Sequence, residues 1–180
     1  VYPDLRKRSI EQLAPLSDCG IAIGGLAVGE DKSAMFDIIE FIDELLPKNQ
    51  PRYLMGVGRP TDLVKAIRLG VDMFDCVLPT RNARNGMLFT SEGFINIKNK
   101  KWENDFSEID LNGTSFVDKR YSKSYLRHLF ISKEMLGPQI ASIHNLSFYL
   151  WLVKESRKKI EDGTFTSWKN KMVKKLVERL

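Results

Sequence analysis

The sequence predicts an α/β fold with a parallel sheet, and three observations point to it. Short apolar runs bounded by glycine or proline lie at residues 20–29, 53–57 and 73–78, as expected of buried strands. Segments with apolar residues at helical spacing lie between them, at residues 33–46 and 61–69. Strand, helix, strand, helix and strand therefore alternate within about 60 residues, which is typical of parallel strands joined by helical crossovers.

The helices of this first part have recognisable starts and stops. A further helix is predicted at residues 4–13, where the apolar side chains lie roughly on one side. Gly70 follows the helix at 61–69, where a left-handed residue is commonly needed. The expected N-caps of the three helices are Asp4, Ser33 and Thr61.

The pattern changes after residue 86. Residues 87–90 and 94–97, separated by Ser-Glu-Gly, predict a β-hairpin, and a polar, loop-rich stretch follows at residues 98–119. Gly137-Pro138 is expected to separate two later helices. Helices are expected at about residues 122–136, 144–161 and, in the basic tail, 165–180.

Composition excludes several classes of protein. The chain has 180 residues, 43% hydrophobic and 28% charged, with only 2 Cys and 2 His. Two cysteines cannot build a disulfide framework, and no apolar run approaches the roughly 20 residues of a membrane span. We therefore expect a cytoplasmic protein without a signal peptide and without contact with a membrane. The chain starts at Val1 rather than Met, which suggests a processed or excerpted piece.

Positive charge is concentrated in the C-terminal third of the chain. Residues 1–118 carry 14 basic and 18 acidic side chains, whereas residues 119–180 carry 14 basic and 5 acidic ones. Such a concentration is expected of a surface that meets phosphates. A solvated helical face rich in lysine explains it equally well on charge alone.

Ligand sites of parallel sheets lie at the carboxyl ends of the strands, so the loops there are the first candidates. Residues 24–27 and 56–59 are rich in glycine, which allows a backbone to approach a flat ligand closely. The pattern at residues 24–29 matches neither a dinucleotide fingerprint nor a phosphate-binding loop, and a purely structural turn is the better explanation of glycines alone.

Asp75 is more informative, because it lies in an otherwise apolar strand. Burying a carboxylate is costly unless it is paired or used. It could act as a nucleophile towards a sugar anomeric carbon, or it could be structural, bound to backbone N–H groups or to Arg81 or Arg84. The two arginines, three residues apart, suit phosphates or base edges.

Several long motifs, in order over nearly the whole chain, resemble bacterial tRNA-guanine transglycosylases, the queuine tRNA-ribosyltransferase family. The motifs are Gly24-Gly-Leu-Ala-Val-Gly-Glu30, Tyr53-Leu-Met-Gly-Val-Gly58, Asp72-Met-Phe-Asp-Cys-Val-Leu-Pro-Thr-Arg81, Arg84-Asn-Gly86, Ile95-Asn-Ile97, Tyr121-Ser122, Tyr125-Leu-Arg-His-Leu129 and Ile143-His-Asn-Leu146.

The resemblance implies the C-terminal part of a (β/α)8 TIM barrel with an inserted subdomain. Residues 1–86 would supply about three βα units, residues 87–145 the hairpin and a degenerate zinc subdomain, and residues 146–180 the C-terminal helices. A complete barrel typically needs about 250 residues, so this chain alone cannot close one.

The resemblance also implies an activity, the exchange of guanine for a 7-deazaguanine, queuine or preQ1, at the anticodon wobble position. Asp75 would be the catalytic nucleophile that holds the tRNA ribose covalently. The implied partners are the tRNA anticodon loop, the free base and a second copy in a homodimer. The implied binding residues are Gly25, Leu26, Ala27, Met55 and Gly56 for the base, and Arg81 and Arg84 for tRNA.

Two other functions remain open. The family's general acid/base and the residues that read the base edge are expected upstream of this chain, so the isolated chain is expected to be inactive. It could instead be a degenerate relative that binds tRNA without catalysis, or a small nucleotide-binding α/β domain.

Family members bind zinc through three cysteines and a histidine. Aligned on Tyr121-Ser122, the cysteine positions hold Gly113, Ser115 and Asp118, and only His144 remains. A carboxylate, a hydroxyl and an imidazole do not make a soft four-ligand zinc site. We therefore expect no cofactor and no zinc. We expect His144 to cap or hydrogen-bond the start of its helix.

Overall fold

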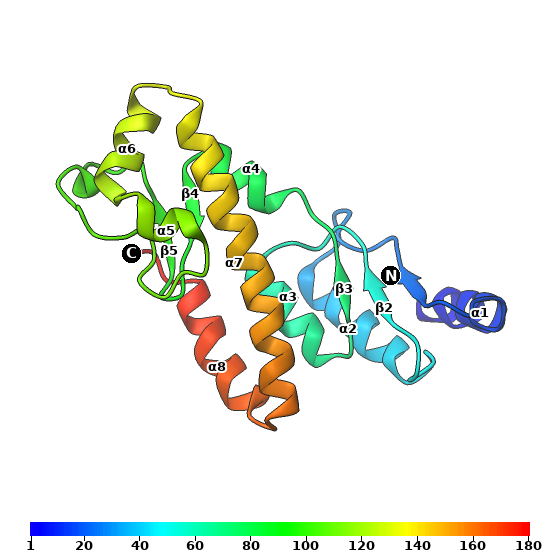
Figure 1. Cartoon of the computed structure of the whole chain (residues 1–180). Coiled ribbons are helices and arrows are strands. Elements are labelled where there is room, and N and C mark those ends of the chain that lie inside the picture. The colour runs from blue at the N-terminus through cyan, green and yellow to red at the C-terminus, as the bar shows by residue number, and fades with distance from the viewer. The chain divides into compact units, whose positions relative to one another are not determined.

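The computed structural model describes all of residues 1–180, which divide into two compact units (Figure 1). The first unit is Val1–Cys76 and the second is Val77–Leu180. Each unit is described by itself. The predicted division after residues 86 and 145 stays a prediction about the larger fold. No helix is both long and apolar enough to cross a membrane.

The first unit is a parallel sheet with helices, as predicted. Its three strands pair in the order β1-β2-β3, with Ile21 opposite Arg52 and Tyr53 opposite Met73. The strands are shorter than the apolar runs that predicted them. In chain order the elements are α1 (Pro3–Leu13), the 3₁₀ helix η1 (Ala14–Leu16), β1 (Ile21–Ile23), α2 (Lys32–Asp43), β2 (Arg52–Leu54), α3 (Pro60–Arg68) and β3 (Met73–Phe74).

Helical spacing accounts for the helices of this unit. The buried side chains of α2 recur three and four residues apart. They are Met35, Ile38, Ile39 and Ile42. The predicted N-caps Asp4, Ser33 and Thr61 are wrong, because each is the second residue of its helix rather than the residue before it. The residues at the N-cap positions are Tyr2, Asp31 and Arg59, none with a side-chain capping bond.

Gly70 illustrates why a glycine ends α3. Its φ is +83°, the left-handed region that other residues rarely adopt. A β-carbon there would also lie 2.9 Å from Asp43 Oδ1. That carboxylate pairs with the guanidinium of Arg52, which is only 5% exposed. The glycine therefore provides both the turn and the space for an ion pair between the buried Arg52 of β2 and the partly exposed Asp43 of α2.

The second unit is mostly helical and is organised around one long helix. The predicted β-hairpin is confirmed, with Met87 opposite Asn96 and Phe89 opposite Phe94. Its elements are α4 (Leu78–Arg84), β4 (Met87–Phe89), β5 (Phe94–Asn96), the 3₁₀ helix η2 (Lys100–Trp102), α5 (Phe116–Arg120), α6 (Lys123–Ile131), α7 (Leu136–Glu161) and α8 (Phe165–Leu176). Figure 1 shows α7 running through this unit, with α4 and the hairpin beside it.

Several predicted boundaries are wrong, two of them beside prolines. Residues 75–78 do not continue the third strand, which ends at Phe74, and α4 begins at Leu78. The helix expected to reach residue 136 ends at Ile131, and the stretch expected to be loop contains α5. Gly137-Pro138 does not separate two helices but lies in the first turn of α7. A proline is tolerated in a first turn because its missing N–H has no helical partner there. Gly137 allows close packing, since a β-carbon would lie 3.2 Å from that of Leu129 in α6.

Both edges of the hairpin are covered. The outer edge of β5 meets the C-terminus, where Phe94 N–H donates to the Glu178 carbonyl (2.9 Å) and Leu180 N–H donates to the Phe94 carbonyl (3.0 Å). The apolar core of this unit lies beneath. Its fully buried members include Leu88, Ile95, Ile97, Leu126 and Ala141.

Asn145 of α7 covers β4 and is fully buried. Its side-chain oxygen accepts from Phe89 N–H (3.1 Å), and its amide nitrogen donates to the carbonyls of Pro79 (2.9 Å) and Met87 (3.0 Å). One side chain thus joins α7 to α4 and to β4. The His-Asn motif of the sequence therefore includes a structural asparagine.

Replacing Asn145 by leucine should destabilise the protein strongly. Leucine fills a similar volume but removes the hydrogen bonds to three backbone groups, two of them buried, which should lower the free energy of unfolding by about 3 kcal/mol. Urea unfolding followed by circular dichroism measures this. Asn170→Leu, at an exposed position of α8, is the matched control. Equal stabilities for the two variants would contradict the role of Asn145.

Candidate functional site

The candidate site lies in the first unit, at the edge of the sheet where the parallel strands end. The loop after β1 holds Gly24 to Ala27, the loop after β2 holds Met55 and Gly56, and Asp75 follows β3 directly. The first two loops are adjacent, because a β-carbon on Gly24 would lie 3.5 Å from the Met55 sulfur. The topology therefore brings together the predicted nucleophile and the predicted base-binding residues.

Asp75 is an exposed carboxylate held by two donors. Its Oδ1 accepts from the Tyr53 hydroxyl (2.7 Å) and from the Gly56 N–H (2.9 Å). The Gly56 N–H and then the Tyr53 hydroxyl hold the pKa of Asp75 below its usual value. The hydrogen bond from the Tyr53 hydroxyl to Asp75 raises the pKa of Tyr53. Asp75 is thus ionised at neutral pH and fixed in orientation. One of its partners is a backbone N–H, which was expected if Asp75 has a structural role.

The glycine-containing loop after β1 is held in an uncommon conformation. Gly25 has φ +63° and Ala27 φ +60°, the latter rare for a residue with a side chain. The Glu30 carboxylate accepts from the N–H groups of Ala27 and Val28, the second at 3.0 Å. The Ala27 bond is the main cause that lowers the pKa of Glu30. Leu26 is buried beneath the loop.

Arg6 holds the same loop from the other side. Its guanidinium donates to the carbonyls of Gly24 (2.6 Å) and Gly25 (3.0 Å). Arg6 and Glu30 hold this loop, although neither was predicted to belong to the site. Glu30 ends the motif at residues 24–30, three residues after Ala27, and an acidic residue at the end of a glycine-rich loop is a signal that could have indicated its role. Arg6 had none, because 18 residues and a strand separate it from Gly24.

Met55 and Gly56 differ in what they offer. The Met55 side chain is 44% exposed and supplies apolar surface beside the glycine loop. Gly56 has φ +73°, and its N–H is engaged by Asp75. Gly56 therefore positions the predicted nucleophile directly.

Arg81 and Arg84 lie in the second unit. Both are exposed on α4, three residues apart and thus on neighbouring turns of one face. The predicted loop around them is a helix. This helix gives two guanidinium groups a fixed spacing, which suits contacts with successive phosphates.

The four residues that align with the zinc ligands of the family, Gly113, Ser115, Asp118 and His144, also lie close together in the second unit. The prediction for His144 is wrong in one respect, because this residue lies more than two turns inside α7 rather than at its start. It is buried and contacts Asp118.

Tyr53→Phe should raise the pKa of Asp75, because one of the two donors that stabilise its charged form is removed. Carbon-13 NMR titration of labelled aspartate carboxyls measures the shift. Tyr2→Phe, at an exposed position of α1's N-cap, is the control and should leave the pKa of Asp75 unchanged. An unaltered titration in the Tyr53 variant would show that its hydroxyl does not stabilise the carboxylate.

Comparisons with known proteins identify the family of the chain. The sequence model described as queuine tRNA-ribosyltransferase matches residues 1–178. Proteins named queuine tRNA-ribosyltransferase are 45% identical in Aquifex aeolicus, over 99% of this chain and 48% of the relative, and 48% identical in Oleidesulfovibrio alaskensis, over 94% and 45%. The Francisella tularensis protein of that name is 47% identical over 96% of this chain and 47% of its own length. The chain thus spans about half the length of these curated relatives, and it belongs to the queuine tRNA-ribosyltransferase family.

Proposed function

We propose that this chain forms part of an enzyme that exchanges guanine for a 7-deazaguanine base at the wobble position of a tRNA anticodon. The observation that carries the proposal is the Asp75 carboxylate, oriented by Tyr53 and Gly56 at the same sheet edge as the glycine loop. Family membership supports the reaction class.

Asp75 is the nucleophile of the proposed reaction. Its carboxylate attacks C1′ of the ribose while the bond from C1′ to guanine breaks, so that the ribose becomes esterified to Asp75. Guanine leaves with the bonding electron pair and takes a proton from the general acid expected outside this chain. The incoming base then gives its ring N–H proton to that group, attacks C1′ and releases the carboxylate. Two inversions return the original configuration. Both hydrogen bonds go to Oδ1, so the attack falls to Oδ2.

The hydrogen bonds to Asp75 serve the second step as well as the first. A carboxylate stabilised by a backbone N–H and a phenol is a better leaving group, because its charged form is favoured. The same donors fix its direction before the ribose arrives, so no reorganisation is needed in the transition state. Tyr53 and Gly56 therefore position the nucleophile and support its release.

The base would lie against the glycine loop. Arg6 fixes the carbonyls of Gly24 and Gly25, and Glu30 fixes the N–H groups of Ala27 and Val28. These bonds hold the loop in one conformation, so the backbone groups of residues 25–27 that they leave free keep set directions, as hydrogen-bond recognition of a flat heterocycle requires. The exposed Met55 side chain would provide the apolar contact beneath the ring.

The tRNA would be held by positive charge in the second unit. Arg81 and Arg84 are the proposed contacts with the anticodon loop, and the basic C-terminal third provides a wider field. The target nucleotide must leave the stacked loop to reach Asp75, which costs less in a single-stranded loop than in a duplex. A homodimer and a cytoplasmic location remain predictions.

A second candidate function is tRNA binding without turnover by the chain alone. It is favoured by the coverage of about half of each relative, together with the expected acid/base and base-reading groups outside these residues. Without those groups, the guanine would have no proton donor and no specific contacts to its edge.

A base-exchange assay separates the two functions. The chain alone should be inactive, whereas the chain joined to the remaining half of the Aquifex aeolicus relative should incorporate labelled base into tRNA. In the joined protein, Asp75→Asn should abolish the covalent tRNA adduct on a denaturing gel and leave tRNA affinity nearly unchanged, since the amide is not a nucleophile. Asp18→Asn, an exposed position, is the control. An adduct that survives in the Asp75 variant would remove this residue from its role.

Arg81→Ala and Arg84→Ala should each weaken tRNA binding, because each removes a proposed phosphate contact. The slope of log affinity against log salt should fall by about 0.7 per lost contact with a single-stranded loop. Filter binding at several salt concentrations measures both effects. Arg8→Ala, exposed on α1, is the matched control. A slope that equals that of the parent protein in both variants would defeat the electrostatic account.

A further inference from the structure

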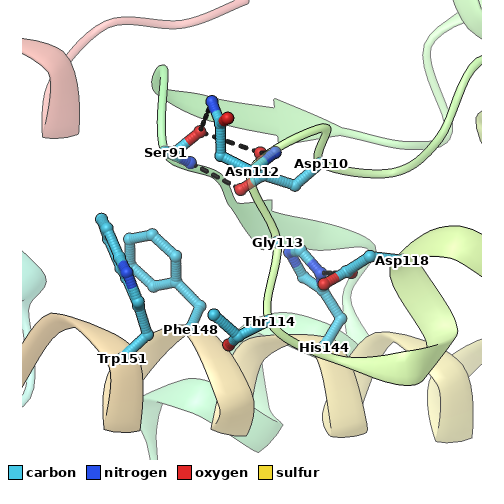
Figure 2. Close-up of a pocket in the computed structure, with 9 residues that line it drawn as sticks. All are labelled: Ser91, Asp110, Asn112, Gly113, Thr114, Asp118, His144, Phe148 and Trp151. Carbon is cyan, nitrogen blue, oxygen red and sulfur yellow. Dashed lines mark hydrogen bonds and ion pairs between the residues drawn. The ribbon is translucent and has the colours of Figure 1, made fainter. Parts of the chain in front are cut away.

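The second unit contains a buried carboxylate and imidazole pair at the place where family resemblance implies zinc. The loop after the hairpin passes over α7, and Gly113, Asp118 and His144 come together there (Figure 2). The Ser115 N–H donates to Asp118, so this residue lies beside them. Asp118 and His144 side chains are each only 2% exposed. A metal ion fits here only if the hydrogen bonds among these residues leave ligand atoms free.

His144 has both ring nitrogens engaged. Nε2 lies 2.7 Å from the Phe89 carbonyl, and Nδ1 lies 2.5 Å from Asp118 Oδ1. A carbonyl oxygen only accepts, so Nε2 carries a hydrogen and donates it to Phe89. Nδ1 faces the carboxylate directly. Neither nitrogen is left to ligate a metal.

Asp118 is equally occupied. Its Oδ1 meets His144, and its Oδ2 accepts from the Ser115 N–H (3.0 Å). The Ser115 hydroxyl in turn accepts from Val117 N–H (3.4 Å), which completes a capping box at the start of α5. The carboxylate that replaces the third cysteine therefore caps one helix and binds the middle of another.

Gly113 leaves the space that this carboxylate fills. A β-carbon on Gly113 would overlap Asp118 Oδ2 and lie 2.9 Å from the Asp110 carbonyl oxygen. A cysteine at residue 113 and this position of Asp118 thus exclude one another. No three His, Cys, Asp or Glu side chains of the chain are grouped to hold a metal ion. The residues present do not fit zinc, which prefers four nitrogen or sulfur ligands in structural sites.

The other end of the loop is also fastened by a carboxylate. Asp110 accepts from the Ser91 N–H (2.7 Å), the Ser91 hydroxyl (2.8 Å) and the Asn112 N–H (3.1 Å). Figure 2 shows this group at the turn of the hairpin, with Asp118 and His144 below it. Both ends of the loop are thus tied to the unit by hydrogen bonds.

We propose that the Asp118–His144 pair is a metal-independent cross-link that takes the place of a zinc site. It joins α5 and its loop to α7 and, through Phe89, to β4. The second unit then folds without zinc. A buried pair of this kind stabilises little by itself, but breaking it leaves an uncompensated buried polar group.

Metal analysis tests the proposal first. The purified, tag-free chain, expressed with added zinc and passed through gel filtration, should retain far less than one equivalent, and chelators should not change its Tm. The variant with Gly113→Cys, Ser115→Cys and Asp118→Cys keeps His144 and should bind about one equivalent of zinc, with a chelator-sensitive Tm. The same variant with His144→Ala is the control and should bind zinc more weakly. Retention of about one equivalent by the parent chain would overturn the proposal.

Unfolding tests the pair itself. Asp118→Asn and His144→Gln should each lower the Tm by roughly 10 °C, and the double variant should lose less than the sum because the two residues act together. Asp162→Asn, exposed at the end of α7, is the control and should leave the Tm nearly unchanged. Additive losses, or a Tm equal to that of the parent in both single variants, would show that the pair is not a cross-link. The zinc measurements on the parent chain remain decisive if a variant fails to fold.

Discussion

Side chains of α7 bind the backbone of one residue in β4, and the second unit depends on this contact. Phe89 donates its N–H to Asn145 and offers its carbonyl to His144, two consecutive residues of the helix. A two-stranded hairpin is marginal alone, and its edges expose unpaired backbone groups. Here a helix satisfies one edge and the C-terminal residues satisfy the other. The hairpin therefore becomes part of a helical core rather than of a larger sheet.

The first unit has the opposite design. Its strands are short and parallel, and β1 and β3 each pair on one side only. Parallel sheets are normally covered and extended by further βα units. Such a sheet is well suited to be one portion of a larger structure, in line with a chain that spans about half of its relatives. The residues of the candidate site lie at the strand ends, where extension of the sheet would bring further loops to the same edge.

The spacing of apolar residues and the positions of glycines predicted most of the elements. In α2 and α3 the buried side chains recur at helical spacing, and the hairpin strands are separated by a short turn that contains glycine. The start of α7 and the presence of α4 escaped prediction, since Pro79 and Pro138 are equally compatible with a loop and with a first helical turn. The candidate nucleophile Asp75 could be chosen from its strand and motif. Arg6 could not, because its partners are two carbonyls far along the chain that become neighbours only when the sheet forms.

Asp75 and Asp118 carry the same carboxylate group, but their different burial and hydrogen-bond partners suit them to different roles. Asp75 is exposed, and both of its donors bind Oδ1, which in the proposed reaction leaves Oδ2 to attack a ribose. Asp118 is buried, and both of its oxygens are consumed by the protein, one by an imidazole and one by a backbone N–H. A carboxylate can replace a thiolate only where such partners take up its charge and where a neighbour gives way. Gly113 leaves space for Asp118 here, so residues 113 and 118 are coupled sterically: the side chain of a cysteine at residue 113 would overlap Asp118 in its present position.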